Sequence, residues 1–153
     1  MDDLDRKILA LLQADAGLSL AEIAERVGLS TTPCWRRIQN LERDGVIRGR
    51  VALLDPGKLN VGVTVFVRVR TSQHSYAWLE RFARAVEEVE EVMEVYRLGG
   101  DIDYLLRIVV PDIASYDDVY KQLIRRIDLS DVSSSFAMET LKQKTALPLG
   151  YAR

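Results

Sequence analysis

The stretch from Ser30 to Asn40 carries the residue types best suited to contact nucleic acid. It reads Ser-Thr-Thr-Pro-Cys-Trp-Arg-Arg-Ile-Gln-Asn. Hydroxyls and backbone donors at a helix N-terminus suit phosphate, and arginines one turn further on reach phosphate or the O6 and N7 acceptors of guanine. The candidate DNA contacts are Ser30, Thr31, Thr32, Trp35, Arg36, Arg37 and Gln39, with Arg48 and Arg50 further along the chain.

The local charge supports this prediction more than the total charge does. With 21 Lys and Arg against 23 Asp and Glu, the chain is slightly acidic and lacks a global basic signature. Between Thr31 and Arg50, however, five arginines face two acidic residues. Several copies of such a patch together attract DNA independently of its sequence. A solvated helix face is the alternative for a charge run alone, and the helix signals around the run favour DNA binding over it.

Two short helices joined by a turn at Gly28 are expected around these residues. Ser19 followed by Glu22 forms a capping box at the start of the first helix, and Gly28 supplies the positive φ that ends it. Ser30 or Thr32 caps the second helix. One face of the first helix is apolar: Leu20, Ile23, Ala24 and Val27. The result is a helix-turn-helix, whose second helix enters a DNA major groove.

A wing and a preceding helix complete the expected N-terminal domain. The second helix buries Cys34 as a small hydrophobe and leaves Arg37 at the border of its exposed face. The run 46–51 is expected to form a strand that holds Arg48 and Arg50 near the DNA backbone. Upstream, a third helix is indicated by an apolar stripe: Leu4, Ile8, Leu11 and Leu12. We therefore predict a winged helix-turn-helix domain over 1–52 and a hinge over 53–61, around the turn residues Asp-Pro-Gly-Lys.

The second half of the chain has a different spacing of apolar residues. Alternating β-branched residues predict a first strand between Val61 and Arg70, and helical spacing follows from Trp78 to Val89. The remaining elements are expected as strands at 92–98 and 102–110, a helix at 113–127 and a strand at 132–141. The order β-α-β-β-α-β predicts a ferredoxin-like antiparallel sheet over 62–153, and the whole chain is of the α+β class.

Apolar residues on both sides of the predicted strands imply a partner for the sheet. Val65 stands beside Phe66, and Leu105 beside Leu106, whereas two helices shield only one side. A second copy of the chain is the expected cover, and a two-fold pair also suits a helix-turn-helix that reads two half-sites. A monomer whose tail, 142–153, folds over the sheet is the alternative. We predict a homodimer as the minimum assembly.

With both halves in view, the chain resembles the Lrp/AsnC family of transcriptional regulators, also called leucine-responsive or feast/famine regulators. The matching stretches are Leu4-Asp5-Arg6-Lys7-Ile8-Leu9, the run from Leu29 to Ile38, Leu41-Glu42, Gly45-Val46-Ile47, Leu54-Asp55-Pro56 and the run from Gly99 to Leu106. The resemblance implies that the first half binds double-stranded DNA. It also implies that the second half is a regulator-of-amino-acid-metabolism (RAM) domain, which dimerises, assembles into rings that are commonly octamers, and binds a small effector, an amino acid in the typical case.

By the same resemblance, the effector loop comprises Gly100, Asp101, Asp103 and Tyr104, and weaker candidates lie on the last strand at Ser133, Ser134, Ser135 and Met138. Carboxylates pair with an α-ammonium group, and a glycine lets backbone donors approach an α-carboxylate. Without the resemblance, a tight turn is the simpler interpretation of the two glycines and Asp101. A metal pair made by Asp101 and Asp103 is disfavoured, because no His or Cys is near them in sequence.

The remaining features favour a cytoplasmic regulator without a cofactor or metal. The N-terminus is charged, no apolar run is long enough to span a membrane, and one cysteine excludes an intramolecular disulfide. His74, the single histidine, is expected in a surface loop. An enzyme resembling siroheme decarboxylases is the less favoured alternative, because no acid–base or nucleophile set converges. An architectural, nucleoid-like DNA-binding protein without an effector stays open. The identity of the effector is not encoded in a recognisable motif.

Overall fold

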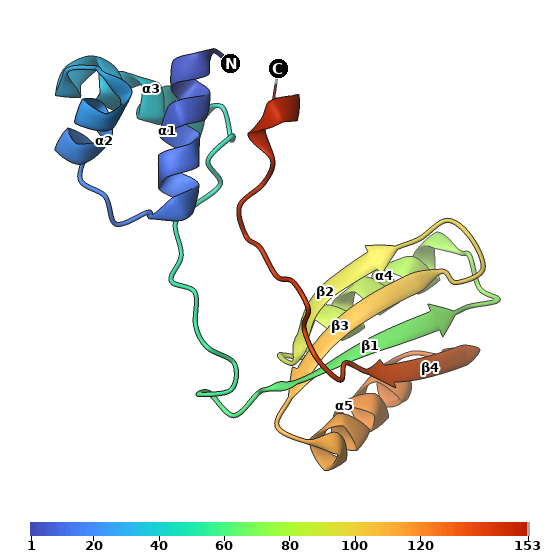
Figure 1. The fold of residues 1–153 in the computed structure, drawn as a ribbon. Helices are drawn as coiled ribbons and strands as arrows, with labels where there is room; N and C mark the ends of the chain where they lie inside the picture. The colour runs from blue at the N-terminus through green and yellow to red at the C-terminus, as the bar shows by residue number, and fades with distance from the viewer. Residues whose placement is uncertain (153) are drawn as a thin grey trace. The chain divides into compact units, whose positions relative to one another are not determined.

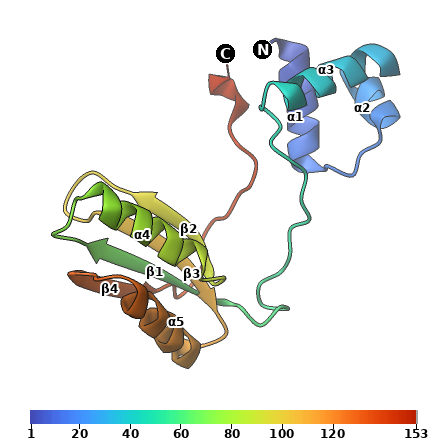
Figure 2. The same cartoon turned by 180° about the vertical axis from the view of Figure 1, so that it is seen from behind.

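A computed structural model describes residues 1–152 and divides the chain into two compact units. The N-terminal unit comprises Met1–Leu53 together with the segment that begins at Leu141. The sheet unit comprises Leu54–Thr140. The N-terminal unit is helical, and the other unit combines a sheet with helices (Figures 1 and 2).

Three helices form the body of the N-terminal unit: α1 (Asp3–Ala14), α2 (Leu20–Val27) and α3 (Thr31–Arg43). The predicted capping box is confirmed, since the Ser19 hydroxyl accepts from the Glu22 amide while the Glu22 carboxylate accepts from the Ser19 amide. Gly28 ends α2 with φ of 72°, as its left-handed role requires. Asp2 and Asp5 form a second capping box at the start of α1.

The helices pack around one small apolar core. Its buried residues are Ile8, Leu9, Ile23, Ala24, Val27, Cys34, Ile38 and Leu41. Cys34 is fully buried, and burial raises the pKa of its thiol, so the predicted packing role is confirmed. The inward face predicted for the second helix is likewise the face that α3 buries.

The expected wing strand is absent from residues 46–51 of the described chain. Gly45 turns the chain with φ of 71°, and the Ile47 amide donates to the carbonyl of Leu41. Beyond this point the segment runs without a ladder partner among residues 1–152, and a strand requires one. The alternation of apolar and basic residues indicated strand propensity but not a partner.

The C-terminal segment also differs from expectation. The sequence predicts one sheet domain over 62–153, with a tail at 142–153 folded over the sheet as the alternative, whereas the segment from Leu141 groups with the N-terminal unit. It contains the short 3₁₀ helix η1 (Leu149–Tyr151), and Leu149 packs against the helical core. The last strand ends at Phe136, not at 141, because the residues that follow lack strand alternation.

The sheet unit has the predicted β-α-β-β-α-β order. Its elements are β1 (Val63–Arg70), α4 (Tyr76–Glu87), β2 (Val92–Arg97), β3 (Tyr104–Val110), α5 (Ile113–Arg126) and β4 (Asp131–Phe136). The strands pair antiparallel in the order β2-β3-β1-β4. Both helices lie on one face of this sheet (Figures 1 and 2). The ferredoxin-like prediction is confirmed.

Strict alternation separates the two faces of the sheet. Val65, Val67 and Val69 of β1 are at most 1% exposed and pack with Trp78 and other helix residues in a large core. The opposite face carries apolar residues that are only partly buried, namely Phe66, Leu105 and Val109. On this face Arg107 binds Glu94 at 2.9 Å, which lowers the pKa of that carboxyl. No helix among residues 1–152 is long and apolar enough to cross a membrane.

Candidate nucleic-acid interface and effector loop

Helix α3 presents the side that the sequence predicted to meet DNA. Thr31, Thr32, Trp35 and Arg36 are exposed, and the Trp35 side chain is 51% exposed. A tryptophan left in solvent on a helix whose other side is core is a candidate contact residue. Ser30 is the N-cap residue by position, but its hydroxyl makes no capping hydrogen bond within residues 1–152. That hydroxyl is therefore free to meet a phosphate.

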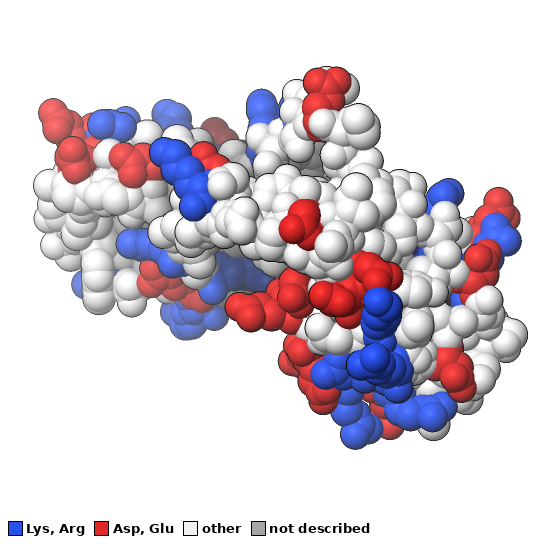
Figure 3. Space-filling model, turned by 90° about the horizontal axis from the view of Figure 1, so that it is seen from below, with Lys and Arg blue, Asp and Glu red and all other residues white. Residues whose placement is uncertain are grey.

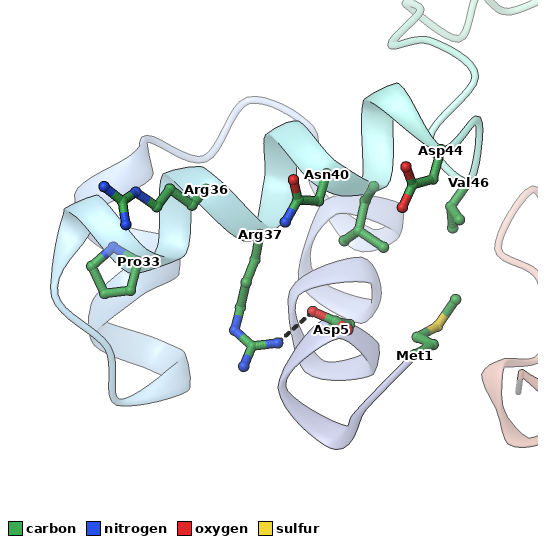
Figure 4. Close-up of a pocket in the computed structure, with 9 residues that line it drawn as sticks. Met1, Asp5, Pro33, Arg36, Arg37, Asn40, Asp44 and Val46 are labelled. Carbon is green, nitrogen blue, oxygen red and sulfur yellow. Dashed lines mark hydrogen bonds and ion pairs between the residues drawn. The ribbon is translucent and has the colours of Figure 1, made fainter.

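Arg37, a predicted DNA contact, binds two carboxylates at the start of α1 in this structure. Its Nη1 donates to carboxylate oxygens of both Asp2 and Asp5, each at 2.7 Å. These bonds raise the pKa of Arg37. Successive helix residues are rotated by about 100°, so Arg37 reaches α1 whereas Arg36 points away from it (Figure 4). Arg37 ties α3 to the start of α1, a role that its position at the border of two faces did not reveal.

A surface hollow of about 540 Å³ lies beside this contact. Figure 4 shows Asp5 and Arg37 meeting within it, and Arg36 and Asn40 on α3 at its wall. The hollow is lined by Met1, Asp5, Pro33, Arg36, Arg37, Asn40, Leu41, Asp44 and Val46. Its wall carries charged groups of both signs, and it lies beside the exposed side of α3.

Glu42 links the recognition helix to the segment after it. Its carboxylate accepts from Gln39 at 2.9 Å and from Arg50 at 3.0 Å. All three side chains are at least partly exposed, so these bonds are weak and can be exchanged for phosphate contacts. Arg36 and Arg48, in contrast, form no ion pair among residues 1–152 and carry uncompensated charge. Figure 3 shows acidic and basic side chains interspersed over the face it displays, in line with the near-neutral composition.

The predicted effector loop joins β2 to β3. Gly100 has φ of 133°, a conformation that favours glycine, and Asp101 is exposed. Asp103 is committed to the sheet: its carboxylate accepts from the Thr71 amide at 2.8 Å, and its own amide donates to the carbonyl of Val69. Asp101 is therefore the carboxylate of this loop that is open to a ligand.

Tyr104 belongs to the buried core of the sheet unit. It is 7% exposed, and its ring packs against Phe82 at a centroid distance of 4.5 Å and against Trp78 at 5.8 Å. Because residues alternate along β3, Tyr104 shares the helix-covered face with Leu106. The structure gives its ring a packing role, and the effector contact of Tyr104 stays a prediction.

The three serines of β4 divide between the two faces. Ser133 pairs with Arg68 and accepts a hydrogen bond from its guanidinium at 2.9 Å. Ser135 has the same orientation, whereas Ser134 faces the helices and contacts the Tyr116 hydroxyl. Burial raises the pKa of Tyr116. The three serines are identical in type, but they lie on alternate faces of the sheet because side chains alternate along a strand.

Within one chain, the predicted effector residues do not form a single site. Val69 pairs with both Tyr104 and Val132, so the effector loop and the start of β4 lie at the same end of the sheet. Met138 follows β4 at the other end, where the Ala137 amide donates to the carbonyl of Thr64, and it is 94% exposed. Met138 therefore lies away from the β2–β3 loop of its own chain.

The structure offers few alternative chemical sites. Among residues 1–152, no group of three or more His, Cys, Asp and Glu side chains is arranged to hold a metal ion. His74 is exposed between β1 and α4, as predicted. Sequence reasoning missed the pairing of Asp2 and Asp5 with Arg37, for which acidic residues at a predicted helix start were a signal, and the return of the chain end, for which there was none.

Two family models match this chain. The model described as Lrp/AsnC ligand binding domain matches residues 64–147, and the model described as Winged helix-turn-helix DNA-binding matches residues 1–48. The two matches correspond to the effector half and the DNA-binding half that the sequence predicted. The α+β architecture and the family resemblance are confirmed.

Several relatives are similar to this chain over almost its full length. The glutamate uptake regulatory protein of Zymomonas mobilis is 55% identical over 97% of this chain and 91% of its own length. An AsnC family transcriptional regulator from Agrobacterium tumefaciens is 62% identical with a TM-score of 0.97 and full coverage of both chains. A Neisseria meningitidis transcriptional regulator, solved with L-Met, is 36% identical with a TM-score of 0.92 over 98% of this chain and 97% of its own. The chain belongs to the Lrp/AsnC family of DNA-binding transcriptional regulators.

Proposed function

We propose that this regulator reads duplex DNA with the exposed side of α3 and that an amino acid bound at the β2–β3 loop controls its binding. The observation that carries the DNA half is the set of solvent-facing side chains at the start of α3, where Thr31, Thr32 and Arg36 surround Trp35. Hydroxyls near a helix N-terminus hold phosphate, and the arginine one turn on reaches a base edge.

Binding is expected to combine a charge-dependent part with a sequence-dependent part. Selection of duplexes from a random library on immobilised protein, followed by titration at several salt concentrations, separates the two. Enrichment of a two-fold related sequence, together with affinity that falls as salt rises, supports a specific regulator. Equal affinity for selected and random duplexes would instead support an architectural DNA-binding protein.

The effector half of the proposal is supported by the loop that contains Gly100 and Asp101. The exposed Asp101 carboxylate suits an α-ammonium group, and the backbone near Gly100 is open to an α-carboxylate. Relatives named for glutamate uptake and for leucine response, and one solved with L-Met, make an amino acid the natural class of ligand. A thermal-shift screen of the purified protein against the amino acids identifies the ligand, because selective binding raises Tm.

Self-association is the third part of the proposal. The sheet face opposite the two helices carries Phe66, Leu105 and Val109, and burying apolar area contributes roughly 25 cal/mol per Å². A two-fold pair of chains joined by this face presents two copies of α3 to two half-sites. Pairs assembled further would place Met138 of one copy near the loop of another. The relatives are regulators, and we propose the same non-enzymatic role here, in the cytoplasm.

A further inference from the structure

The chain end returns to the helix-turn-helix. The segment from Leu141 belongs to the N-terminal unit although the whole sheet unit separates the two in sequence. Near the end of this segment, η1 places Leu149 against the helical core, and Ile47, from the segment after α3, packs on the same core. The contact is therefore a docked peptide on the surface of the three helices.

Two side chains of α1 recognise the backbone of this peptide. The Gln13 side-chain amide donates to the carbonyl of Leu147 at 3.2 Å, and its oxygen accepts from the Leu147 amide at 2.6 Å. About two turns closer to the start of α1, Arg6 donates to the carbonyl of Ala152 at 3.1 Å. The Gln13 amide thus forms hydrogen bonds with both the N–H and the C=O of Leu147, as the backbone of a neighbouring strand would, and these bonds fix the register of the peptide on α1.

The docked peptide and the segment after α3 bound a common cavity of about 770 Å³. Its lining includes Arg48 and Arg50 together with Leu147, Leu149 and Tyr151 of the peptide. The segment with the two arginines has no strand partner within residues 1–152. The segment is held by the Arg50–Glu42 ion pair and by the packing of Ile47 on the helical core, the core on which the docked Leu149 also packs.

We propose, on the basis of the DNA-binding function above, that the C-terminal peptide from Thr145 to Ala152 completes the DNA-binding unit. Docked on α1, it holds the arginine-bearing segment after α3 in its DNA-binding position. Release of the peptide leaves α3 folded but lets that segment move. The chain end thereby controls DNA affinity without touching DNA, and residues 137–144 form a second covalent connection from the effector domain to the DNA-binding unit.

The test uses matched leucines and matched glutamines in the full-length chain. Leu149→Ser removes the docked side chain, and Leu141→Ser, at a leucine that is 87% exposed, is the control. Gln13→Ala removes the backbone recognition on the protein surface, and Gln143→Ala is its control. The readouts are the exchange rate of the Leu147 backbone amide and the affinity for a selected duplex.

We expect Gln13→Ala to speed exchange of the Leu147 amide by about two- to tenfold, the range of one lost hydrogen bond. We expect Leu149→Ser to weaken docking by about fivefold, as for one partly buried leucine, and to lower DNA affinity by up to that factor. Both controls stay at wild-type values. Unchanged Leu147 exchange in Gln13→Ala, or DNA affinity in Leu149→Ser equal to that in Leu141→Ser, overturns the proposal. If the wild-type protein does not bind DNA, the DNA-binding function is refuted instead. The exchange rate of the Leu147 amide then still tests whether the peptide is docked.

Discussion

Replacing the neighbouring arginines Arg36 and Arg37 by alanine should have different effects, one on DNA binding and the other on stability. Arg36 lies on the exposed side of α3 and forms no ion pair among residues 1–152, whereas Arg37 binds Asp2 and Asp5 at 2.7 Å. Arg36→Ala removes a DNA contact, and Arg37→Ala removes a link between α3 and α1. The two variants therefore separate loss of a DNA contact from loss of a contact that stabilises the three-helix fold.

The expected sizes differ accordingly. If Arg36 contacts one phosphate, its loss reduces the slope of log K against log salt by about 0.9, and if it contacts a base it costs about 1–3 kcal/mol of specific binding. The link between Arg37 and Asp5 is partly exposed, so we assign it about 0.5–1 kcal/mol. For a unit of this size, that corresponds to a fall in Tm of about 2–8 °C.

Asp5→Asn is the matched control, because it removes the charge of one of the two carboxylates that bind Arg37 and leaves the Arg37 cation in place. Fluorescence anisotropy titrations at four salt concentrations and a calorimetric Tm are the assays. We expect Arg36→Ala to flatten the salt dependence at unchanged Tm, and Arg37→Ala and Asp5→Asn to lower Tm at nearly unchanged slope. A wild-type Tm in Arg37→Ala together with a flattened slope would refute the assignment of Arg37 to support.

The other predictions concern the effector loop, the sheet and the start of α1. Asp101→Ala abolishes the response of DNA binding to the effector and leaves basal binding nearly intact; an unchanged response in a gel-shift titration contradicts the loop assignment. Phe66→Glu puts a charge on the sheet face opposite the helices and shifts sedimentation towards the monomer, and an unaltered sedimentation profile would exclude this face from the interface. Trp78→Ala empties a fully buried site and costs about 3–5 kcal/mol in chemical denaturation, so a loss below 1 kcal/mol would argue against the core described here. The hydrogen bond from the Asp5 amide, and then that from Arg37, hold the pKa of Asp2 below its ordinary 3.8, so Asp2 stabilises the fold above that pH and its contribution is lost as the pH falls through the lower, folded-state pKa. Asp2→Asn should reduce this acid sensitivity of Tm, and an identical pH profile would show that Asp2 does not contribute.

Local signals were sufficient for most of the architecture. The capping box at Ser19, the left-handed Gly28 and the alternation in β1 depend on residues close in sequence, and each fixed its element correctly. The same is true of the buried face of α3, which a period of 3.6 residues determines. The family resemblance added the effector loop, which composition and spacing alone would have left as a turn.

The features that sequence reasoning missed all depend on contacts between distant residues. Arg37 looks like its neighbour until Asp5, 32 positions away, is placed beside it. The packing of the Tyr104 ring depends on Trp78 and Phe82, which are distant from it in sequence. The expected wing strand required a partner, and the docking of Leu147 on Gln13 joins positions 134 residues apart. Propensity describes a segment, whereas these assignments depend on what packs against it.

Crosslinking from the recognition helix tests the central claim most directly. A photoreactive benzoylphenylalanine replaces Trp35 on α3 in one protein and Tyr76, a 75% exposed aromatic on α4, in another. Each is irradiated with a duplex selected by the wild-type protein. We predict a crosslink from position 35 that maps within the selected site and none from position 76. Crosslinking from position 76 alone, or equally from both positions, would contradict the account.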